Sequence, residues 1–338
     1  MADAGGDAHA TIAPMMATPG PVPGGSGAGW AFEVKFDGVR AIGYGRPGGL
    51  RLVSRNDRDV SGSYPEVGAL DLGGIGDLGA GIVLDGELVA LDGRGRPDFE
   101  LLQQRMHVVR PSAELVAQVP VGYVVFDVLR LGGRSLLGEP YRERREVLAA
   151  LGLPDHGVQV PPNFTGTAGA VVLDAVAQQG LEGVVAKRLE SSYQPGRRSK
   201  SWVKTAIRHT HEVVVVGWSP SRGHRGALSA LLLGAHDEHG ELVYVGDVGT
   251  GFTDAARARL LERLRPLERA GSPFEGEFVR ARGWPGRAPT SEVHWVAPEL
   301  VGEIEYRAFT REGRFRHPSW RGLRPDRDPA EVALPPRD

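Results

Sequence analysis

The sequence of 338 residues contains no cysteine, which excludes disulfide bonds, thiol nucleophiles and cysteine zinc sites. It also lacks any apolar run near the roughly 18 residues of a membrane-spanning helix. The first residues, MADAGGDAHATIAP, have neither the basic nor the apolar region of a secretory signal. No internal repeat is visible. These absences predict a cytoplasmic globular protein without a membrane partner.

The sequence also lacks an excess of charge of one sign. It has 40 lysines and arginines and 42 aspartates and glutamates, for a net charge of −2. The cations are nevertheless clustered. Residues 187–208 hold seven cations and one acid, and residues 311–327 hold six arginines and two acids. Such stretches attract phosphates even on a nearly neutral protein. The alternative interpretation is that both stretches are solvent-exposed surface without a phosphate partner.

The length suits two domains, and the residue patterns indicate where they divide. Residues 1–11 are rich in glycine and alanine and are expected to be disordered. Residues 12–208 alternate short strands with a few helices. Strands are predicted at 30–34, 40–44, 50–54, 81–91 and 123–129, and helices at 98–106, 141–151 and 168–179.

The pattern changes after a polar stretch at 208–211, which we interpret as a hinge. In residues 209–331 we predict strands at 211–218, 227–235, 241–248, 292–296 and 303–309. Thr253 is the expected cap of one helix, whose inner face carries Leu260, Leu261, Leu264 and Leu267. Five strands and one helix predict a small OB-fold β-barrel, followed by a C-terminal tail at 332–338.

The sequence EVKFDGVR, residues 33–40, carries the pattern K-x-D-G-x-R. Lys35 lies where a predicted strand meets a turn. A free lysine has a pKa of about 10.4 and is almost fully protonated at neutral pH. To act as a nucleophile, its amine needs burial or neighbouring cations. A surface lysine beside a β-turn is the alternative.

Further motifs follow in order: SRN at 54–56, LDGEL at 84–88, VFDVL at 125–129, EGVVAK at 182–187, SWVK at 201–204 and RHPSW through RPDR at 316–327. The ordered set resembles the covalent nucleotidyltransferase superfamily of ATP-dependent DNA ligases, RNA ligases and capping enzymes. PELVGE at 298–303 and RHPSWRG at 316–322 are similar to the ligase module of bacterial end-joining enzymes of the ligase D type, here as a stand-alone protein.

The resemblance implies an α+β architecture. An adenylyltransferase domain of ATP-grasp-like antiparallel sheets with helices would occupy residues 12–208, and an OB-fold domain would follow at 209–331. It also implies that Lys35 attacks the α-phosphate of ATP and forms lysyl-AMP. AMP then passes to a DNA 5′-phosphate, and the 3′-hydroxyl displaces it.

The resemblance further implies the nucleotide site. Glu33 would accept the exocyclic amine of adenine, and Phe126 would stack on the base, although a phenylalanine in YVVFDVL could also be core. Two lysines would lie against the α-phosphate and favour an uncharged Lys35 amine. The implied nucleotide-binding set is Glu33, Val34, Arg40, Arg55, Glu87, Phe126, Lys187, Lys204 and Arg324.

Two carboxylates, Glu182 and Glu87, are the candidate ligands of Mg²⁺ or Mn²⁺, because these cations prefer oxygen. Ion pairs with nearby cations are the alternative. The implied residues that orient pyrophosphate are Arg324, Asp326 and Arg327. The implied DNA-binding residues are Arg55, Arg197, Arg198, Lys200, Arg316 and Arg321.

The expected partner is nicked or broken duplex DNA, with recruitment by a Ku-like end-binding protein and a nucleoid-associated monomer as further expectations. The chain departs from the family pattern at Ala206, where many relatives have a second lysine, and at Arg327, where they have lysine. An RNA ligase or capping-type enzyme is one alternative. A non-catalytic nucleic-acid-binding module is another, supported only by Ala206.

Overall fold

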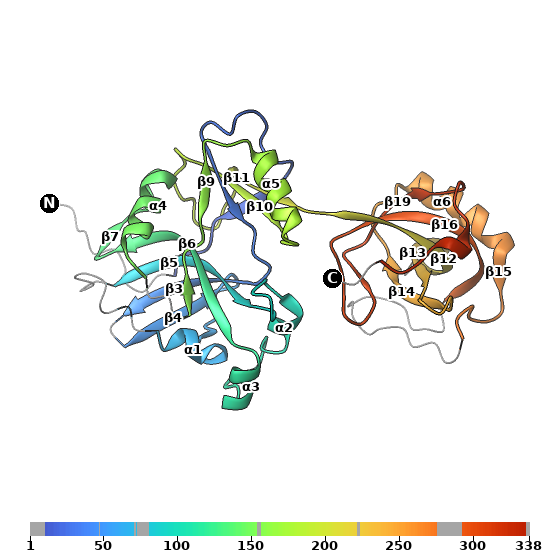
Figure 1. The fold of residues 1–338 in the computed structure, drawn as a ribbon, viewed down its shortest axis with the longest axis horizontal. Helices are drawn as coiled ribbons and strands as arrows, with labels where there is room; N and C mark the ends of the chain where they lie inside the picture. The colour runs from blue at the N-terminus through green and yellow to red at the C-terminus, as the bar shows by residue number, and fades with distance from the viewer. Residues whose placement is uncertain are drawn as a thin grey trace. The chain divides into compact units, whose positions relative to one another are not determined.

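The computed structural model describes residues 11–46, 48–70, 72, 81–153, 157–221, 224–275 and 293–335. The chain forms two compact units, Met1–Ile207 and Arg208–Asp338 (Figure 1). Residues 1–10, for which we predicted disorder, lie outside the described residues, as do residues 336–338, the end of the predicted tail.

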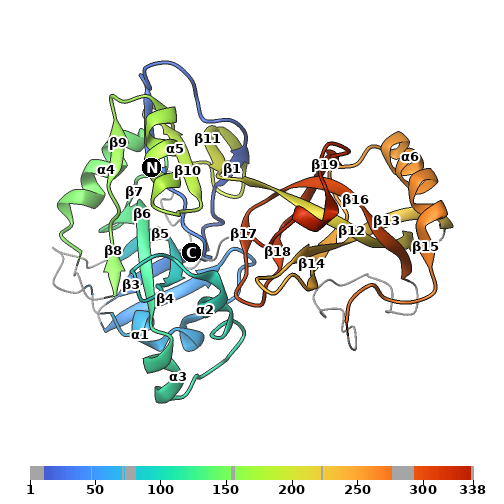
Figure 2. The ribbon, with the colours of Figure 1, turned by 45° about the vertical axis from the view of Figure 1, so that its right-hand side comes forward.

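The first unit contains two sheets, which Figures 1 and 2 show as separate layers. In one sheet the strand order is β1 (Met16–Pro19), β11 (Arg198–Ala206), β10 (Gly183–Arg188), β2 (Trp30–Val34) and β9 (Asn163–Thr165). β1 runs parallel to β11, and the other pairs are antiparallel. Helix α5 (Gly169–Gln178) covers this sheet and buries Val172 and Val176 against Phe32.

In the other sheet the order is β4 (Gly49–Ser54), β3 (Val39–Arg46), β5 (Ile82–Ala90), β6 (Val121–Leu131) and β7 (Arg134–Ser135), with β8 (Val158–Gln159) parallel to β6. The short helices α1 (Pro65–Gly68), α2 (Phe99–Gln103) and α3 (Ala113–Gln118) adjoin it, and α4 (Tyr141–Ala150) packs on β6. A core that includes Leu52, Val67, Leu84 and Leu102 lies under α1 and α2.

A bulge in β6 lies at Phe126. Asp85 of β5 pairs with Asp127, but the next residue, Gly86, pairs with Val125, so Phe126 is an extra residue. Bulges re-aim side chains and are common beside active sites. Here Phe126 leaves the α1 and α2 core and joins Trp202 of the opposite sheet in a small cluster between the two layers.

The second unit is one curled sheet of order β14 (Leu242–Val248), β13 (His224–His236), β12 (His209–Ser221), β16 (His294–Tyr306) and β15 (Glu268–Arg269), with β19 (Ser319–Leu323) on β16. A small hairpin joins β17 (Ala308–Phe309) to β18 (Phe315–Arg316). Thr253 caps α6 (Asp254–Leu264) by accepting a hydrogen bond from Ala256 N at 3.1 Å, as predicted. The α+β class and the OB-type second domain are confirmed.

One strand prediction is wrong. We expected separate strands at 292–296 and 303–309, but the chain runs as the single strand β16 and then the short β17. Pro298 lies between the two predicted strands, and proline cannot donate to a ladder. The structure places Pro298 in a register shift, where Val215 pairs with Leu300 and Gly217 with Trp295. The irregularity absorbs the proline without ending the strand.

Helix α4 is fixed to the second sheet by a buried ion pair. Arg144 donates from Nε and Nη2 to the two carboxylate oxygens of Asp127, at 2.8 Å each. Its Nη1 also donates to the carbonyl oxygens of Glu139 and Ser191, at 2.7 and 3.1 Å. Both charged side chains have no exposed surface. The pair therefore joins α4, β6 and the chain after β10 at one point.

We predict that Arg144→Met lowers the free energy of unfolding of the first unit by about 3–5 kcal/mol, because it leaves Asp127 buried and unpaired. The matched control is Arg142→Met on the same helix, whose exposed pair with Glu190 contributes less than about 1 kcal/mol. Chemical denaturation, with hydrogen exchange assigning the loss to α4 and β6, measures both. Equal losses in the two variants would contradict the prediction.

Candidate active site

A cavity of about 220 Å³ lies between the two sheets of the first unit. One wall comes from β2, β10 and β11, and the other from β3, β5 and β6. The structure brings together here Lys35 and every predicted nucleotide-binding residue except Arg324: Glu33, Val34, Arg40, Arg55, Glu87, Phe126, Lys187 and Lys204. Residues from 33 to 204 therefore converge on one polar space.

Two glycines position Lys35. Its backbone N donates to the carbonyl oxygen of Gly183 at 2.8 Å, just after β2 ends. Gly183 has a φ of +149°, and a Cβ there would lie 2.1 Å from the carbonyl oxygen of Thr205. A Cβ on Gly38 would lie 2.2 Å from the carbonyl oxygen of Leu88. Both motif glycines thus permit close backbone approaches around the lysine.

The Lys35 amine forms an ion pair with Glu182, the residue before Gly183. The Lys35 side chain is 21% exposed and that of Glu182 is 7% exposed, so the amine is partly open to the cavity while its partner is enclosed. The interpretation of Lys35 as a lysine on an open surface is therefore not supported by the geometry. The Lys35 amine is therefore accessible to a ligand in this cavity.

Lys187 is buried and lies among aromatic rings. Its Nζ is 2.7 Å from Glu33 Oε2, and it donates to the carbonyl oxygen of Phe126 at 3.3 Å. The same nitrogen lies 4.4 Å from the ring centres of Phe126 and Trp202. Burial lowers the pKa of Lys187, against the opposing effect of Glu33. In this structure Lys187 holds Glu33, and its contact with a phosphate stays a prediction.

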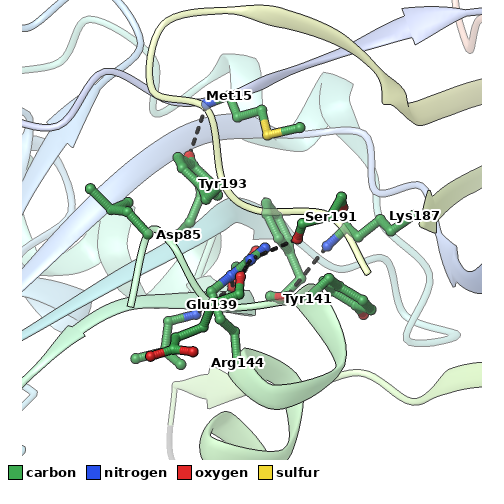
Figure 3. Close-up of polar contacts among 12 residues, drawn as sticks. Met15, Asp85, Glu139, Tyr141, Arg144, Lys187, Ser191 and Tyr193 are labelled. Atoms are coloured by element: carbon green, nitrogen blue, oxygen red, sulfur yellow. Dashed lines mark hydrogen bonds and ion pairs between the residues drawn. The ribbon is translucent and has the colours of Figure 1, made fainter. Parts of the chain in front are cut away.

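Arg40 is held by two residues to which sequence reasoning gave no role. Its Nη2 donates to Asp85 Oδ2 at 2.6 Å, and Tyr193 donates to the same oxygen at 2.6 Å. Tyr193 also accepts a hydrogen bond from Met15 N at 2.8 Å (Figure 3). The guanidinium carbon of Arg40 is 4.5 Å from the ring centre of Phe126. Asp85 and Tyr193 thus fix the arginine beside the predicted stacking surface.

Glu87 and Lys204 have perturbed ionisation within the cavity. Burial raises the pKa of Glu87 to about 7, although Arg40 and Lys35 act in the opposite direction. Burial lowers the pKa of Lys204, and the positive charges of Lys35 and Arg198 lower it further. Shifts of this kind are frequent at functional sites.

A divalent cation fits the two predicted metal ligands, Glu87 and Glu182. Across the described ranges, no group of three or more histidine, cysteine or acidic side chains could hold a metal alone. Mg²⁺ commonly takes only one or two carboxylates and completes its shell with water and substrate phosphates. Glu87 lines the cavity and Glu182 pairs with Lys35, so both carboxylates lie at this site, and their binding of a metal stays a prediction.

The predicted DNA-binding cations of the first unit divide into two groups. Arg55 and Arg198 line the cavity, and Arg198 also donates to the carbonyl oxygen of Ala17 at 2.6 Å. Arg197 and Lys200 are exposed and do not line it. Arg198 is therefore a cavity cation in addition to the lysines. Arg208, which belongs to the second unit, pairs with Glu305 of that unit at 3.1 Å.

The three predicted pyrophosphate residues meet in one ionic network of the second unit. Arg324 contacts Glu303 at 3.0 Å and Glu212 at 3.2 Å, and it donates to both oxygens of Asp326. Arg327 lies 2.7 Å from Glu212. The hydrogen bond from Arg324 lowers the pKa of Asp326 to about 2. Nearby on β19, Arg321 pairs with Glu305 at 2.6 Å, and the predicted DNA contact Arg316 ends β18.

Comparison with known families assigns both units. Residues 14–205 match the model of the ATP dependent DNA ligase domain, and residues 224–327 match the ATP dependent DNA ligase C terminal region. DNA ligase C1 of Mycolicibacterium smegmatis is 35% identical over 337 residues, covering 96% of this chain and 92% of that protein. The chain belongs to the ATP-dependent DNA ligases. The RNA ligase, capping-enzyme and non-catalytic alternatives are not favoured.

This ligase is also similar to parts of larger proteins. The multifunctional non-homologous end joining protein LigD of M. smegmatis is 44% identical over 325 residues, which are 95% of this chain. The chain spans only 39% of that relative's length. A solved structure of mycobacterial DNA ligase D complexed with ATP and MES matches with a TM-score of 0.52 and 39% identity, over 96% of this chain and 98% of that one. Among the described helices, none has the length and apolar character to cross a bilayer.

The raised pKa of Glu87 predicts a pH effect. Below about pH 7 this carboxyl is mostly protonated, so it loses the negative charge that would hold a cation. We expect kcat/KM for adenylation, at Mg²⁺ concentrations well below saturation, to fall as pH drops through about 7. Glu87→Gln lowers the rate and removes this inflection, whereas Glu114→Gln, at an exposed position, retains it. An unchanged inflection in Glu87→Gln would assign it to another group.

Proposed function

We propose that this ligase joins 3′-hydroxyl and 5′-phosphate ends in duplex DNA through lysyl-AMP on Lys35. The observation that carries the proposal is the enclosure of one amine, paired with Glu182, in a cavity that Lys187, Lys204 and Arg40 also line. Cations placed where phosphate charge develops are the main source of catalysis in phosphoryl transfer.

In the first step the Lys35 amine loses a proton, and Glu182 is the carboxylate already in contact with it. Nζ then bonds to the α-phosphorus of ATP, the bond to the bridging oxygen breaks, and pyrophosphate leaves. A DNA 5′-phosphate next takes AMP from Lys35. The 3′-hydroxyl finally displaces AMP and closes the strand.

The walls of the cavity support separate roles for its residues. Phe126 offers a ring for stacking on adenine, a contact of about 1–3 kcal/mol per base in other proteins. Glu33 supplies the carboxylate for the exocyclic amine. Arg40 and Arg55 take ribose or phosphate oxygens, which suits the planar guanidinium. Glu87 and Glu182 would hold Mg²⁺, which when bound offsets phosphate charge.

DNA and partner roles follow from surface charge and from the relatives. We propose phosphate contacts by Arg197 and Lys200 of the first unit and by Arg316 and Arg321 of the second. The LigD relatives carry end joining in their names, which supports a role in double-strand break repair with a Ku-like partner. A monomer at the bacterial nucleoid completes the proposal.

The division into two units supports the proposed domains, an adenylyltransferase domain at 12–208 and an OB-fold domain at 209–331 with a tail at 332–338. In this assignment Arg324, Asp326 and Arg327 act only in the first step, where they orient pyrophosphate. The OB-fold domain would then move away before DNA is sealed.

Lys35→Ala is expected to abolish the covalent adduct of about 329 Da that forms with ATP and Mg²⁺, because the nucleophile is lost. Lys35→Arg should fail equally, since a guanidinium stays protonated. Lys200→Ala should retain the adduct, because Lys200 lies outside the cavity lining and DNA takes no part in this step. Intact-mass spectrometry measures all three. An adduct on Lys35→Ala would refute the assignment.

Arg324→Ala is expected to lower lysyl-AMP formation by at least about 100-fold, as losses of charge-stabilising groups do. The same variant should seal nicked DNA that already carries 5′-AMP within about threefold of the wild-type rate, because pyrophosphate is absent from that step. Gel assays of the two steps give the comparison. Equal loss of both activities would contradict a role confined to the first step.

A further inference from the structure

The Glu33 carboxylate is held from two sides by buried donors. Lys187 of β10 contacts Oε2 at 2.7 Å, and the Tyr141 hydroxyl at the start of α4 donates to Oε1. All three side chains are almost fully enclosed. Lys187 supplies the opposite charge that a buried carboxylate requires, so the tyrosine is not needed for neutralisation. The second donor instead fixes the direction in which the carboxylate points.

Tyr141 itself is fixed by a rigid support. Its backbone N donates to the carbonyl oxygen of Ser191 at 2.9 Å, and Arg144, paired with Asp127, donates to the same oxygen at 3.1 Å. Figure 3 shows the Tyr141, Arg144 and Ser191 side chains gathered around this point. Burial and the neighbouring Glu33 raise the pKa of Tyr141 well above its usual value, so the hydroxyl keeps its proton and remains a donor.

An ionised carboxylate offers about four acceptor positions, of which the two donors use one on each oxygen. Glu33 lines the cavity, so the remaining positions can accept from a ligand there. An amino group at C6 of a purine matches such an acceptor. A 6-oxo group places two acceptors against each other and leaves both unpaired, which is strongly unfavourable in a buried site.

We propose that Tyr141 is the positioning residue for base selection: it holds Glu33 so that the carboxylate accepts the 6-amino group of adenine and disfavours 6-oxo purines. The inference rests on the proposed contact between Glu33 and adenine, and it adds a residue from outside the nucleotide motifs. Tyr141 does not line the cavity, so it acts through Glu33 and not on the base.

Tyr141→Phe removes only the hydroxyl. The ring that lies 5.0 Å from Lys187 Nζ is kept. The test compares ATP with purine riboside 5′-triphosphate, which lacks the 6-amino group, in the lysyl-AMP step. We expect kcat/KM for ATP to fall about tenfold, mostly through KM, because a hydrogen bond to a charged group is lost. For the purine analogue the fall should be less than about twofold, because the amino contact is absent there.

The matched control is Tyr244→Phe. Tyr244 is a buried tyrosine of the second unit whose hydroxyl donates to Asp247 at 2.7 Å. The Tyr244→Phe variant should keep the wild-type ratio of kcat/KM for ATP to kcat/KM for the analogue. The ratio is measured within each variant, so a partial loss of folded protein cancels. Inosine triphosphate carries a 6-oxo group. Its kcat/KM, relative to that of ATP, should rise in Tyr141→Phe and not in Tyr244→Phe.

Equal losses with ATP and the analogue in Tyr141→Phe would show that the tyrosine only supports the fold, and would overturn the inference. Glu33→Gln separates this failure from failure of the proposed function. If Glu33→Gln loses the ATP preference and Tyr141→Phe keeps it, the base contact stands and the role of Tyr141 is wrong. If the wild-type protein shows no preference between ATP and the analogue, the proposed contact between Glu33 and adenine fails, and the role of Tyr141 fails with it.

Discussion

Pairing of enclosed cations with carboxylates is the constraint on which the first unit depends. Removing a charge from water is costly unless an opposite charge meets it, and four cations among the described residues of this unit meet a carboxylate in this way. Lys35 meets Glu182, Lys187 meets Glu33, Arg40 meets Asp85 and Arg144 meets Asp127. The pairs link β2 to β10, β3 to β5 and α4 to β6. The polar cavity and the fold around it are therefore stabilised by the same contacts.

The choice of lysine over arginine follows the same physics. Of the 40 lysines and arginines only four are lysines, and three of them, Lys35, Lys187 and Lys204, line the cavity. An arginine keeps its proton in any protein environment, whereas an amine responds to its surroundings. Burial lowers the pKa of both Lys187 and Lys204. The chain thus uses arginine for contacts with charge and keeps amines where a proton can be lost.

Sequence reasoning reached the cavity residues but not what holds them. The ordered motifs indicated Lys35 and eight lining residues, and periodicity predicted α4 to within one residue. The bulge at Phe126 has no local signal, because it depends on the register between β5 and β6. The bond from Tyr193 to Asp85 joins residues 108 positions apart, beyond any local pattern. A signal did exist for Asp85 and Asp127: a lone acid inside an apolar strand needs a buried partner.

The two ends of the cavity share one support, the segment between β10 and β11. Ser191 accepts from Arg144 and from the backbone of Tyr141, which donates to Glu33 at the proposed base end. Two residues later, Tyr193 donates to Asp85, which holds Arg40 at the proposed ribose and phosphate end. Tightly packed side chains transmit displacement because few voids absorb it. A shift of this segment would therefore be felt by Glu33 and by Arg40, so the segment couples the proposed base end of the cavity to the proposed phosphate end.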